Sequence, residues 1–244
     1  MKVVFLGATK GMGRALARRM AERGAEMFLL GRDLEDLERS AADLKLHGAT
    51  TVGIGSCDLL DVAGFVPALE AAAQAMGSLD TVVITAGLFA TQDVLEADPE
   101  LTHRVLAADF TNTVLFCEEA RKRLLAGGGG NLCVFSSVAG ERGRKPVILY
   151  GAAKAGLSHY LEGLDHKFRQ QGLRTIVVKP GFVKTAMTAG LKPPPFSGEP
   201  DQVADIVMKA IDRGTPEVYA PGMWRWVMLV IRNLPRQVMR RIGF

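Results

Sequence analysis

The feature that most constrains this chain is a regular alternation of short apolar runs and longer amphipathic stretches. Seven runs are rich in β-branched and other apolar residues: KVVFL, EMFLL, TTVGI, DTVVIT, NLCVFS, RTIVVK and EVYA. Helix-length stretches separate them, at roughly 11–22, 33–47, 62–76, 98–126, 147–171 and 200–213. This alternation is typical of strand–helix–strand units around a parallel sheet, whose strands are apolar because helices cover both faces. We therefore expect an α/β fold with a doubly wound, mainly parallel, seven-stranded sheet.

Length and composition favour one large domain. The 244 residues are 48% hydrophobic, which is enough to build a sizeable core. We expect a domain over residues 1–221 and a basic amphipathic tail over residues 222–244. The strand-like run that ends at Leu6 leaves no room for a signal peptide, so we expect a cytoplasmic protein. Three scattered cysteines are interpreted as reduced, buried thiols, and their spacing predicts no metal site.

The positive charge is concentrated at one end of the chain. The formal net charge is +4, but the segment from Val218 to Phe244 holds five arginines and no acidic residue, which leaves −1 for residues 1–217. A nucleic-acid-binding protein would spread its Lys and Arg residues over a groove or a recognition face. We therefore expect no nucleic-acid partner.

The stretch GATKGMG, residues 7–13, connects the first expected strand to the first expected helix. A tight turn there needs residues without steric limits, and a phosphate needs backbone N–H groups that no Cβ shields. Gly7, Gly11 and Gly13 meet both needs in the spacing G-x-x-x-G-x-G, a variant of the commoner fingerprint G-x-G-x-x-G. A simple turn is the alternative. We favour a dinucleotide-binding loop and hence a single Rossmann-like domain.

Charges at the end of the second strand favour NADP(H) over NAD(H). An NAD site places an acidic residue against the ribose hydroxyls there, whereas this chain has Gly31 followed by Arg32. Lys10 adds a second cation within the glycine loop. Two cations suit the extra phosphate of NADP(H), with its charge of about −1.5 to −2, better than they suit neutral hydroxyls. The alternative is that both are ordinary surface cations. Asp33, next to Arg32, also leaves binding of NAD(H) as an alternative.

Three polar residues predict a site for carbonyl chemistry. Tyr150 and Lys154 are four residues apart on an expected helix, and Ser137 closes the strand that precedes it. Because ligands bind at the strand ends of an open parallel sheet, the three side chains can meet over one cavity. Reduction of a ketone needs a proton donor at the carbonyl oxygen, and a nearby ammonium lowers the pKa of tyrosine from about 10. Tyr150 then acts as general acid/base, Lys154 activates it, and Ser137 donates to the carbonyl oxygen.

With these motifs the chain resembles the short-chain dehydrogenase/reductase family over residues 1 to about 220. The resemblance rests on GATKGMG, CDLLD, ITAG, Ser137, YGAAK and KPGFVKT, a set that is highly specific as a whole. It implies a homodimer or homotetramer, with Asp58 near the adenine and Val183 and Thr185 at the nicotinamide carboxamide. The cofactor-binding residues that it implies are Gly7, Thr9, Lys10, Gly11, Met12, Gly13, Arg32, Asp58, Leu59, Ala86, Gly87, Tyr150, Lys154, Pro180, Gly181, Val183 and Thr185.

Asp109 departs from the family pattern, in which an asparagine at the matching position helps to hold a water relay from the lysine to solvent. An acid there is expected to hold the Lys154 ammonium firmly, to weaken its effect on Tyr150 and to move the pH optimum upward. We interpret Asp109 as a catalytic-site residue that tunes the relay. Asn112 is an alternative source of the missing amide. Thr85 is a smaller departure, because the family more often has asparagine there.

The tail is unlike the short ends of many family members. A helix there would carry one basic and one apolar stripe, and Pro235 should interrupt it. The basic stripe comprises Arg225, Arg232, Arg236 and Arg240, and the apolar stripe comprises Trp224, Val227, Met228 and Ile231. We favour packing of the apolar stripe on the domain or on a dimer mate; peripheral contact with anionic lipid is the alternative. The tail also loosely resembles that of relatives that reduce keto sugars on polyprenyl carriers.

The sequence therefore predicts an NADP-dependent oxidoreductase that interconverts a ketone or aldehyde and an alcohol of small size. NAD-dependent alcohol oxidation and a nucleotide-sensing protein without turnover are the alternatives. We expect three irregular segments to build the substrate pocket: residues 88–97, the ERGRKP loop before Tyr150, and a Pro-rich flap at 186–198. The three cations of that loop indicate either an anionic substrate or ordinary surface charge.

Overall fold

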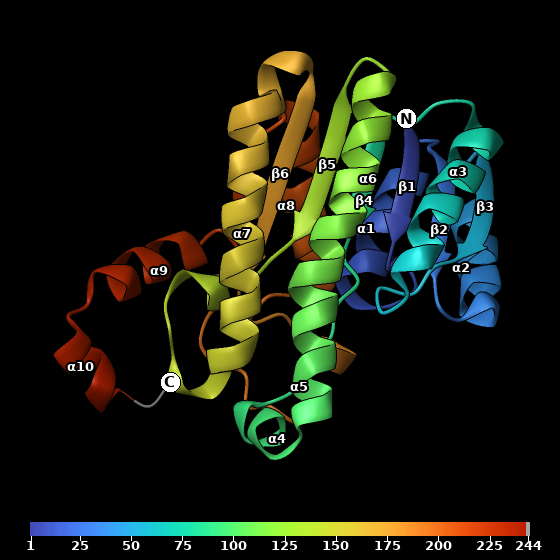
Figure 1. The fold of residues 1–244 in the computed structure, drawn as a ribbon. Coiled ribbons are helices and arrows are strands. Elements are labelled where there is room, and N and C mark those ends of the chain that lie inside the picture. The colour runs from blue at the N-terminus through green and yellow to red at the C-terminus, as the bar shows by residue number, and fades with distance from the viewer. Residues whose placement is uncertain (243–244) are drawn as a thin grey trace.

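The computed structural model describes residues 1–242 and contains one sheet between two layers of helices (Figure 1). The strands follow the predicted runs: β1 Lys2–Leu6, β2 Glu26–Gly31, β3 Thr51–Ser56, β4 Thr81–Ile84, β5 Gly130–Phe135, β6 Leu173–Pro180 and β7 Glu217–Ala220. Their order is β3-β2-β1-β4-β5-β6-β7, and every neighbouring pair is parallel. The doubly wound α/β fold is confirmed, and the sheet is parallel throughout the described residues.

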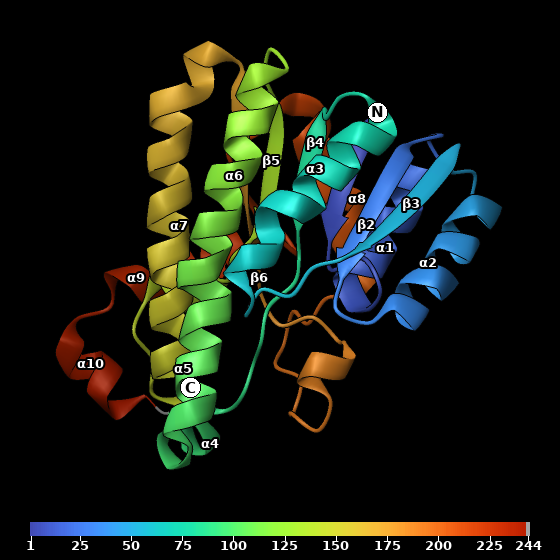
Figure 2. The same ribbon diagram turned by 45° about the vertical axis from the view of Figure 1, so that its right-hand side comes forward.

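Two apolar cores hold the helices to the sheet, one on each face. One layer consists of α1 Gly11–Ala21, α2 Leu34–Leu46 and α8 Pro200–Arg213, and the other of α3 Phe65–Met76, α6 Asn112–Ala126 and α7 Ile148–Phe168 (Figures 1 and 2). Strand side chains alternate between the cores: Val3 and Phe5 of β1 face α1, whereas Val4 and Leu6 face α3. Both faces are therefore apolar, as the continuous runs predicted.

The strand order reverses at β1, which lies between β2 and β4. The connections from β1 to β2 and from β2 to β3 run toward one edge of the sheet, whereas those from β4 onward run toward the other edge, so the loops diverge at the carboxyl ends of β1 and β4. Such a switch point leaves a crevice where ligands bind in open α/β sheets. This position places the glycine loop after β1 at one wall of the crevice.

The helix predicted over residues 98–126 is interrupted. It consists of α5 Pro99–Leu106, a π-helical turn Ala107–Thr111 and α6. Asp98 caps the start of α5, since its carboxylate accepts from the Leu101 N–H at 2.9 Å. A further helix, α4 Gln92–Ala97, lies in a segment that was expected to be irregular. Short 3₁₀ turns span Val62–Gly64, Val138–Glu141, Lys145–Val147, Arg169–Gln171 and Ala186–Thr188.

The tail forms two helices that project beyond the β7 edge of the sheet: α9 Trp224–Asn233 and α10 Arg236–Arg241 (Figure 1). They are separated next to Pro235, as predicted. Trp224, Met228 and Ile231 of α9 are buried in a small core with Val138 and Tyr219. The apolar stripe of the tail thus packs on the body of the chain. None of the helices in residues 1–242 has the length and apolar character needed to cross a membrane.

Candidate active site

The glycine loop is shaped by close backbone approach. Gly7 has φ +101°, and a Cβ there would lie 2.6 Å from the Ala86 backbone nitrogen. A Cβ on Gly13 would lie 2.1 Å from the Gly7 carbonyl oxygen. Helix α1 begins at Gly11, and no side chain caps its first N–H groups. These N–H groups and the positive end of the helix dipole suit a phosphate, so the loop fits a dinucleotide.

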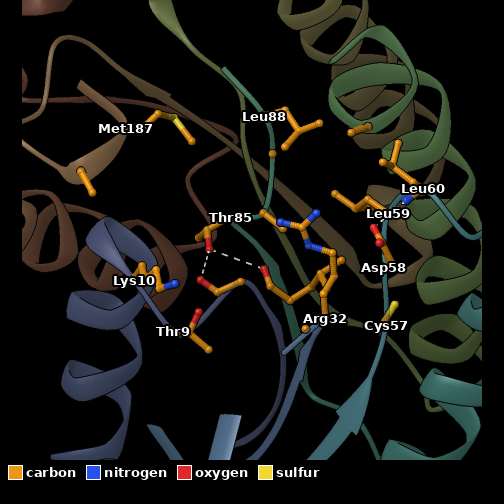
Figure 3. Close-up of a pocket in the computed structure, with 17 residues that line it drawn as sticks. Thr9, Lys10, Arg32, Cys57, Asp58, Leu59, Leu60, Thr85, Leu88 and Met187 are labelled. Atoms are coloured by element: carbon orange, nitrogen blue, oxygen red, sulfur yellow. Dashed lines mark hydrogen bonds between the residues drawn. The ribbon is translucent and has the colours of Figure 1, made fainter. Parts of the chain in front are cut away.

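Thr85 fastens this loop to the end of β4. Its hydroxyl donates to the Gly7 carbonyl oxygen at 2.8 Å, and the dashed lines at Thr85 in Figure 3 mark the hydrogen bonds of this hydroxyl. The Thr85 hydroxyl oxygen would also lie 2.5 Å from a Cβ on Gly13, so the absence of a side chain at Gly13 leaves room for this threonine. The sequence identified Thr85 only as a departure from asparagine and gave no sign of this contact.

A cavity of about 310 Å³ opens above the loop (Figure 3). Eight predicted cofactor residues line it: Gly7, Thr9, Lys10, Arg32, Asp58, Leu59, Ala86 and Gly87. The other nine lining residues were not among the predicted cofactor contacts: Leu6, Gly31, Cys57, Leu60, Thr85, Leu88, Ala108, Ala186 and Met187. Leu88, Ala186 and Met187 belong to segments that were expected to build the substrate pocket. Lining residues follow β1, β2, β3 and β4, so the cavity occupies the crevice at the switch point.

Nine predicted cofactor residues lie outside this lining: Gly11, Met12, Gly13, Tyr150, Lys154, Pro180, Gly181, Val183 and Thr185. Thr185 still adjoins the glycine loop, because a Cβ on Gly11 would lie 3.3 Å from its methyl group. Val183 is buried and forms a β-bridge with Gly198 in the flap. A Cβ on Gly181 would overlap the indole of Trp224, so this glycine admits the tail to the end of β6.

The charged side chains around the cavity differ in whether they form ion pairs or hydrogen bonds with other residues. Arg32 is exposed at the rim and has no ion pair within residues 1–242. Lys10 pairs with Asp36 at 2.8 Å, and this contact is the main reason that the pKa of Asp36 is lowered. Asp33 caps α2 by accepting from the Asp36 N–H at 3.0 Å. The acid next to Arg32 thus has a structural partner in α2.

Ser137, Tyr150 and Lys154 converge at the carboxyl end of β5. Tyr150 lies in the first turn of α7 and its hydroxyl hydrogen-bonds with Ser137. Lys154 lies one turn later, is buried, and its ammonium is 5.6 Å from the centre of the Tyr150 ring. That ammonium also donates to the Phe135 carbonyl oxygen at 3.3 Å. The Ser137 hydroxyl, the Tyr150 ring and the Lys154 ammonium therefore lie together at this strand end, as expected.

Asp109 completes this group from the π-helical turn. Its side chain is 0% exposed, and its Oδ1 lies 3.8 Å from the Lys154 ammonium. Oδ1 also accepts from the Leu88 N–H at 2.8 Å, whereas Oδ2 has no hydrogen-bond partner within residues 1–242. Burial raises the pKa of this carboxyl, and Lys154 opposes the rise. A Cβ on Gly87 would lie 2.6 Å from Oδ1, so only glycine leaves room for the carboxylate.

The pKa of Tyr150 differs from the expectation. Burial raises it, the Asp109 carboxylate raises it further, and the hydrogen bond with Ser137 lowers it. The predicted lowering by Lys154 does not prevail, because burial is the largest influence on this pKa and the ammonium also interacts with the Asp109 carboxylate. The phenol is consequently protonated at neutral pH, which is the state that a proton donor needs.

Asn112 was the alternative source of the relay amide, and its role in a relay stays a prediction. Its amide donates to the Leu59 carbonyl oxygen at 2.7 Å, which joins the start of α6 to the cavity wall. The matching position is occupied by Asp109 itself.

Two supporting contacts were missed by sequence reasoning. The buried Ser136 hydroxyl donates to the Lys154 carbonyl oxygen at 2.9 Å and fixes α7 against β5. The Gln92 side-chain oxygen accepts from the Leu149 N–H at 3.1 Å and caps the turn that carries Tyr150. Both contacts join segments far apart in the sequence, so no local pattern could have indicated them.

Comparison with known proteins identifies the family. The family model described as short chain dehydrogenase matches residues 1–195. The chain belongs to the short-chain dehydrogenase family. An uncharacterized oxidoreductase of Mycobacterium tuberculosis is 34% identical over 240 residues, covering 98% of this chain and 96% of that protein. Carbonyl reductase family member 4 of Xenopus tropicalis is 27% identical over 210 residues, covering 83% and 87%.

A solved structure shows the same fold. A short-chain type dehydrogenase/reductase from Mycobacterium ulcerans superposes with a TM-score of 0.81 at 22% identity, covering 89% of this chain and 86% of that one. The short-chain dehydrogenases are oxidoreductases that use a nicotinamide cofactor and act on small molecules. This chain is accordingly an oxidoreductase of that family.

Proposed function

We propose that the protein is an NADPH-dependent reductase that converts a ketone or aldehyde to an alcohol. The observation that carries this proposal is the convergence of Ser137, Tyr150 and Lys154 at a point next to the cavity: the Lys154 ammonium would lie 3.6 Å from a Cβ on Gly87, which lines the cavity. The similarity to carbonyl reductases supports the reaction class. We further propose a cytoplasmic location and a homodimeric or homotetrameric state.

Each residue has a distinct task in this mechanism. The bound cofactor supplies the hydride for the carbonyl carbon. Tyr150 donates its proton to the carbonyl oxygen, and Ser137 hydrogen-bonds to the same oxygen as negative charge develops on it. Lys154 is held by the Phe135 carbonyl and Asp109, close enough to stabilise the phenolate left behind. The raised pKa of Tyr150 favours the reductive direction, because reduction starts from a protonated phenol.

The preference for NADPH rests on the rim of the cavity. Arg32 lies there without an ion-pair partner within the described chain, and Gly31 presents no carboxylate to ribose hydroxyls. Asp33 is engaged as the cap of α2, which weakens the case for NAD(H). Arg32 is free to pair with the additional phosphate of NADPH, whereas Lys10 would have to exchange Asp36 for it.

Asp109 is proposed to hold Lys154 and to tune proton transfer. A buried carboxylate beside the ammonium keeps the lysine in place and raises the pKa of Tyr150. Oδ2, which has no partner in the described chain, is available to a water molecule that passes protons onward. A nucleotide sensor without turnover is the rival reading; the arrangement around Tyr150 argues against it.

The test measures NADPH consumption by the purified protein with a panel of ketones and aldehydes. Tyr150→Phe is expected to lower kcat by about 10²–10⁴-fold while thermal stabilisation by NADPH is retained. Tyr160→Phe is the matched control, because that hydroxyl donates to Glu118 of α6 at 2.7 Å and does not line the cavity. Stabilisation by NADPH without turnover of any carbonyl would favour the sensor instead.

A further inference from the structure

Helix α9 has two apolar stripes, and only one of them packs on the protein. Trp224, Met228 and Ile231 are buried. Three other side chains, spaced three and four residues apart, form a second stripe: Met223 is 48% exposed, Trp226 61% and Val230 63%. Side chains at this spacing share a helix face. We call this set the exposed stripe; no described part of the chain covers it.

Basic residues surround the exposed stripe. All five arginines of α9 and α10 are exposed, and no acidic residue follows Glu217. The Arg225 guanidinium lies 5.9 Å from the Trp226 ring centre. Further cations lie at a cavity of about 380 Å³ between α10 and the ERGRKP loop. Its lining includes Arg142, Arg144, Lys145, Arg236 and Arg240. The two helices project from the body in both ribbon views, so their outer face is accessible (Figures 1 and 2).

The positive charge of the tail decides which kind of partner could cover the exposed stripe. A second copy joined by two-fold symmetry would bring the same arginines together, and like charges repel. A nucleic acid would satisfy the arginines but would leave three large apolar side chains against phosphates. An anionic bilayer satisfies both, because apolar side chains enter its interface while guanidinium groups meet the lipid phosphates. Tryptophan in particular favours the headgroup level of a bilayer.

We propose that α9 and α10 form a docking surface for an anionic lipid bilayer. The exposed stripe enters the interface, and the arginines pair with lipid headgroups. The buried stripe keeps the body attached to α9 while the opposite face is in lipid. This inference concerns where the enzyme works and is independent of the proposed reaction, which takes place in the cavity at the end of the sheet.

Vesicle flotation tests the proposal with the full chain. The protein is expected to float with vesicles of phosphatidylcholine and phosphatidylglycerol, not with phosphatidylcholine alone, and to dissociate as salt rises. Trp226→Ser with Val230→Ser is expected to abolish flotation. Leu46→Ser is the matched control, because Leu46 is 90% exposed at the end of α2 and far from the tail. No flotation of the parent, or equal flotation of the double variant, would overturn the proposal.

Fluorescence locates the contact. Anionic vesicles are expected to shift the emission to shorter wavelength, and Trp226→Phe should remove the shift while flotation persists, because Trp224 is already buried. Thermal stabilisation by NADPH, unchanged in every tail variant, verifies folding separately from lipid binding. Two results would refute the lipid assignment. If duplex DNA displaces the protein from the vesicles, the surface binds nucleic acid. If the parent forms a dimer without vesicles and the double variant does not, the surface binds a second copy of the chain.

Discussion

The Asp109 carboxylate lies 3.8 Å from the Lys154 ammonium and is completely buried. Its charge raises the pKa of Tyr150, so removing the charge should lower that pKa. Because reduction requires the protonated phenol, Asp109→Asn should move the alkaline fall of kcat/KM to lower pH, with activity at neutral pH within about tenfold of the parent. Asp212→Asn, in an exposed pair with Arg23, is the control. An unchanged pH profile would rule out this role.

Arg32 should decide between the two nicotinamide cofactors. Loss of a charged hydrogen bond to the additional phosphate costs about 1.5–3 kcal/mol, so Arg32→Ala should raise KM for NADPH by roughly 10- to 100-fold and leave KM for NADH unchanged. Arg213→Ala is the control, because Arg213 is exposed at the carboxyl end of α8 and does not line the cavity. Steady-state kinetics with both cofactors checks this. Equal losses for NADPH and NADH would contradict the assignment.

Gly87 should tolerate no side chain while Asp109 is present. In Gly87→Ala the new methyl group would lie 2.6 Å from the Asp109 carboxylate and displace it, with an expected loss of about 1–3 kcal/mol in the free energy of unfolding. A second change, Asp109→Ala, should recover part of that loss, which urea denaturation of the four proteins in a double-mutant cycle measures. Gly163→Ala, which meets nothing within 4 Å, should cost nothing. Strict additivity would disprove the contact.

The neighbouring tryptophans of α9 should respond in opposite ways. Trp224 is 8% exposed and its indole donates to the Phe196 carbonyl oxygen at 3.1 Å, so Trp224→Ala should cost about 3–5 kcal/mol of stability. Trp226→Ala removes an exposed ring and should change stability by less than about 0.5 kcal/mol. Thermal and urea denaturation compare the two. Equal effects would mean that the tail is packed differently.

The sequence predicted the parts of the fold that depend on local pattern. Every strand was found because its apolar run is bounded by turn residues, and Tyr150 and Lys154 were paired through helical spacing alone. Contacts between remote segments were not predictable in this way. The hydrogen bond from Thr85 to Gly7 and that from Leu149 to Gln92 depend on how β1, β4 and α7 come together in space.

The π-helical turn at Ala107–Thr111 also escaped prediction, since its residues read as ordinary helix. The π-helical turn presents the Asp109 side chain to Lys154, and π-helical turns often occur at functional sites. The expected effect of Lys154 on Tyr150 failed for a related reason. Sequence spacing gives the proximity of two side chains, but burial and a third charge determine the pKa.

The hydrogen bond between Trp224 and Phe196 joins the tail to the Pro-rich flap. Any outward swing of the flap must either break this bond or carry α9 along with it. As long as this bond persists, a displacement of the outer helices also displaces the segment that borders the crevice beside the glycine loop.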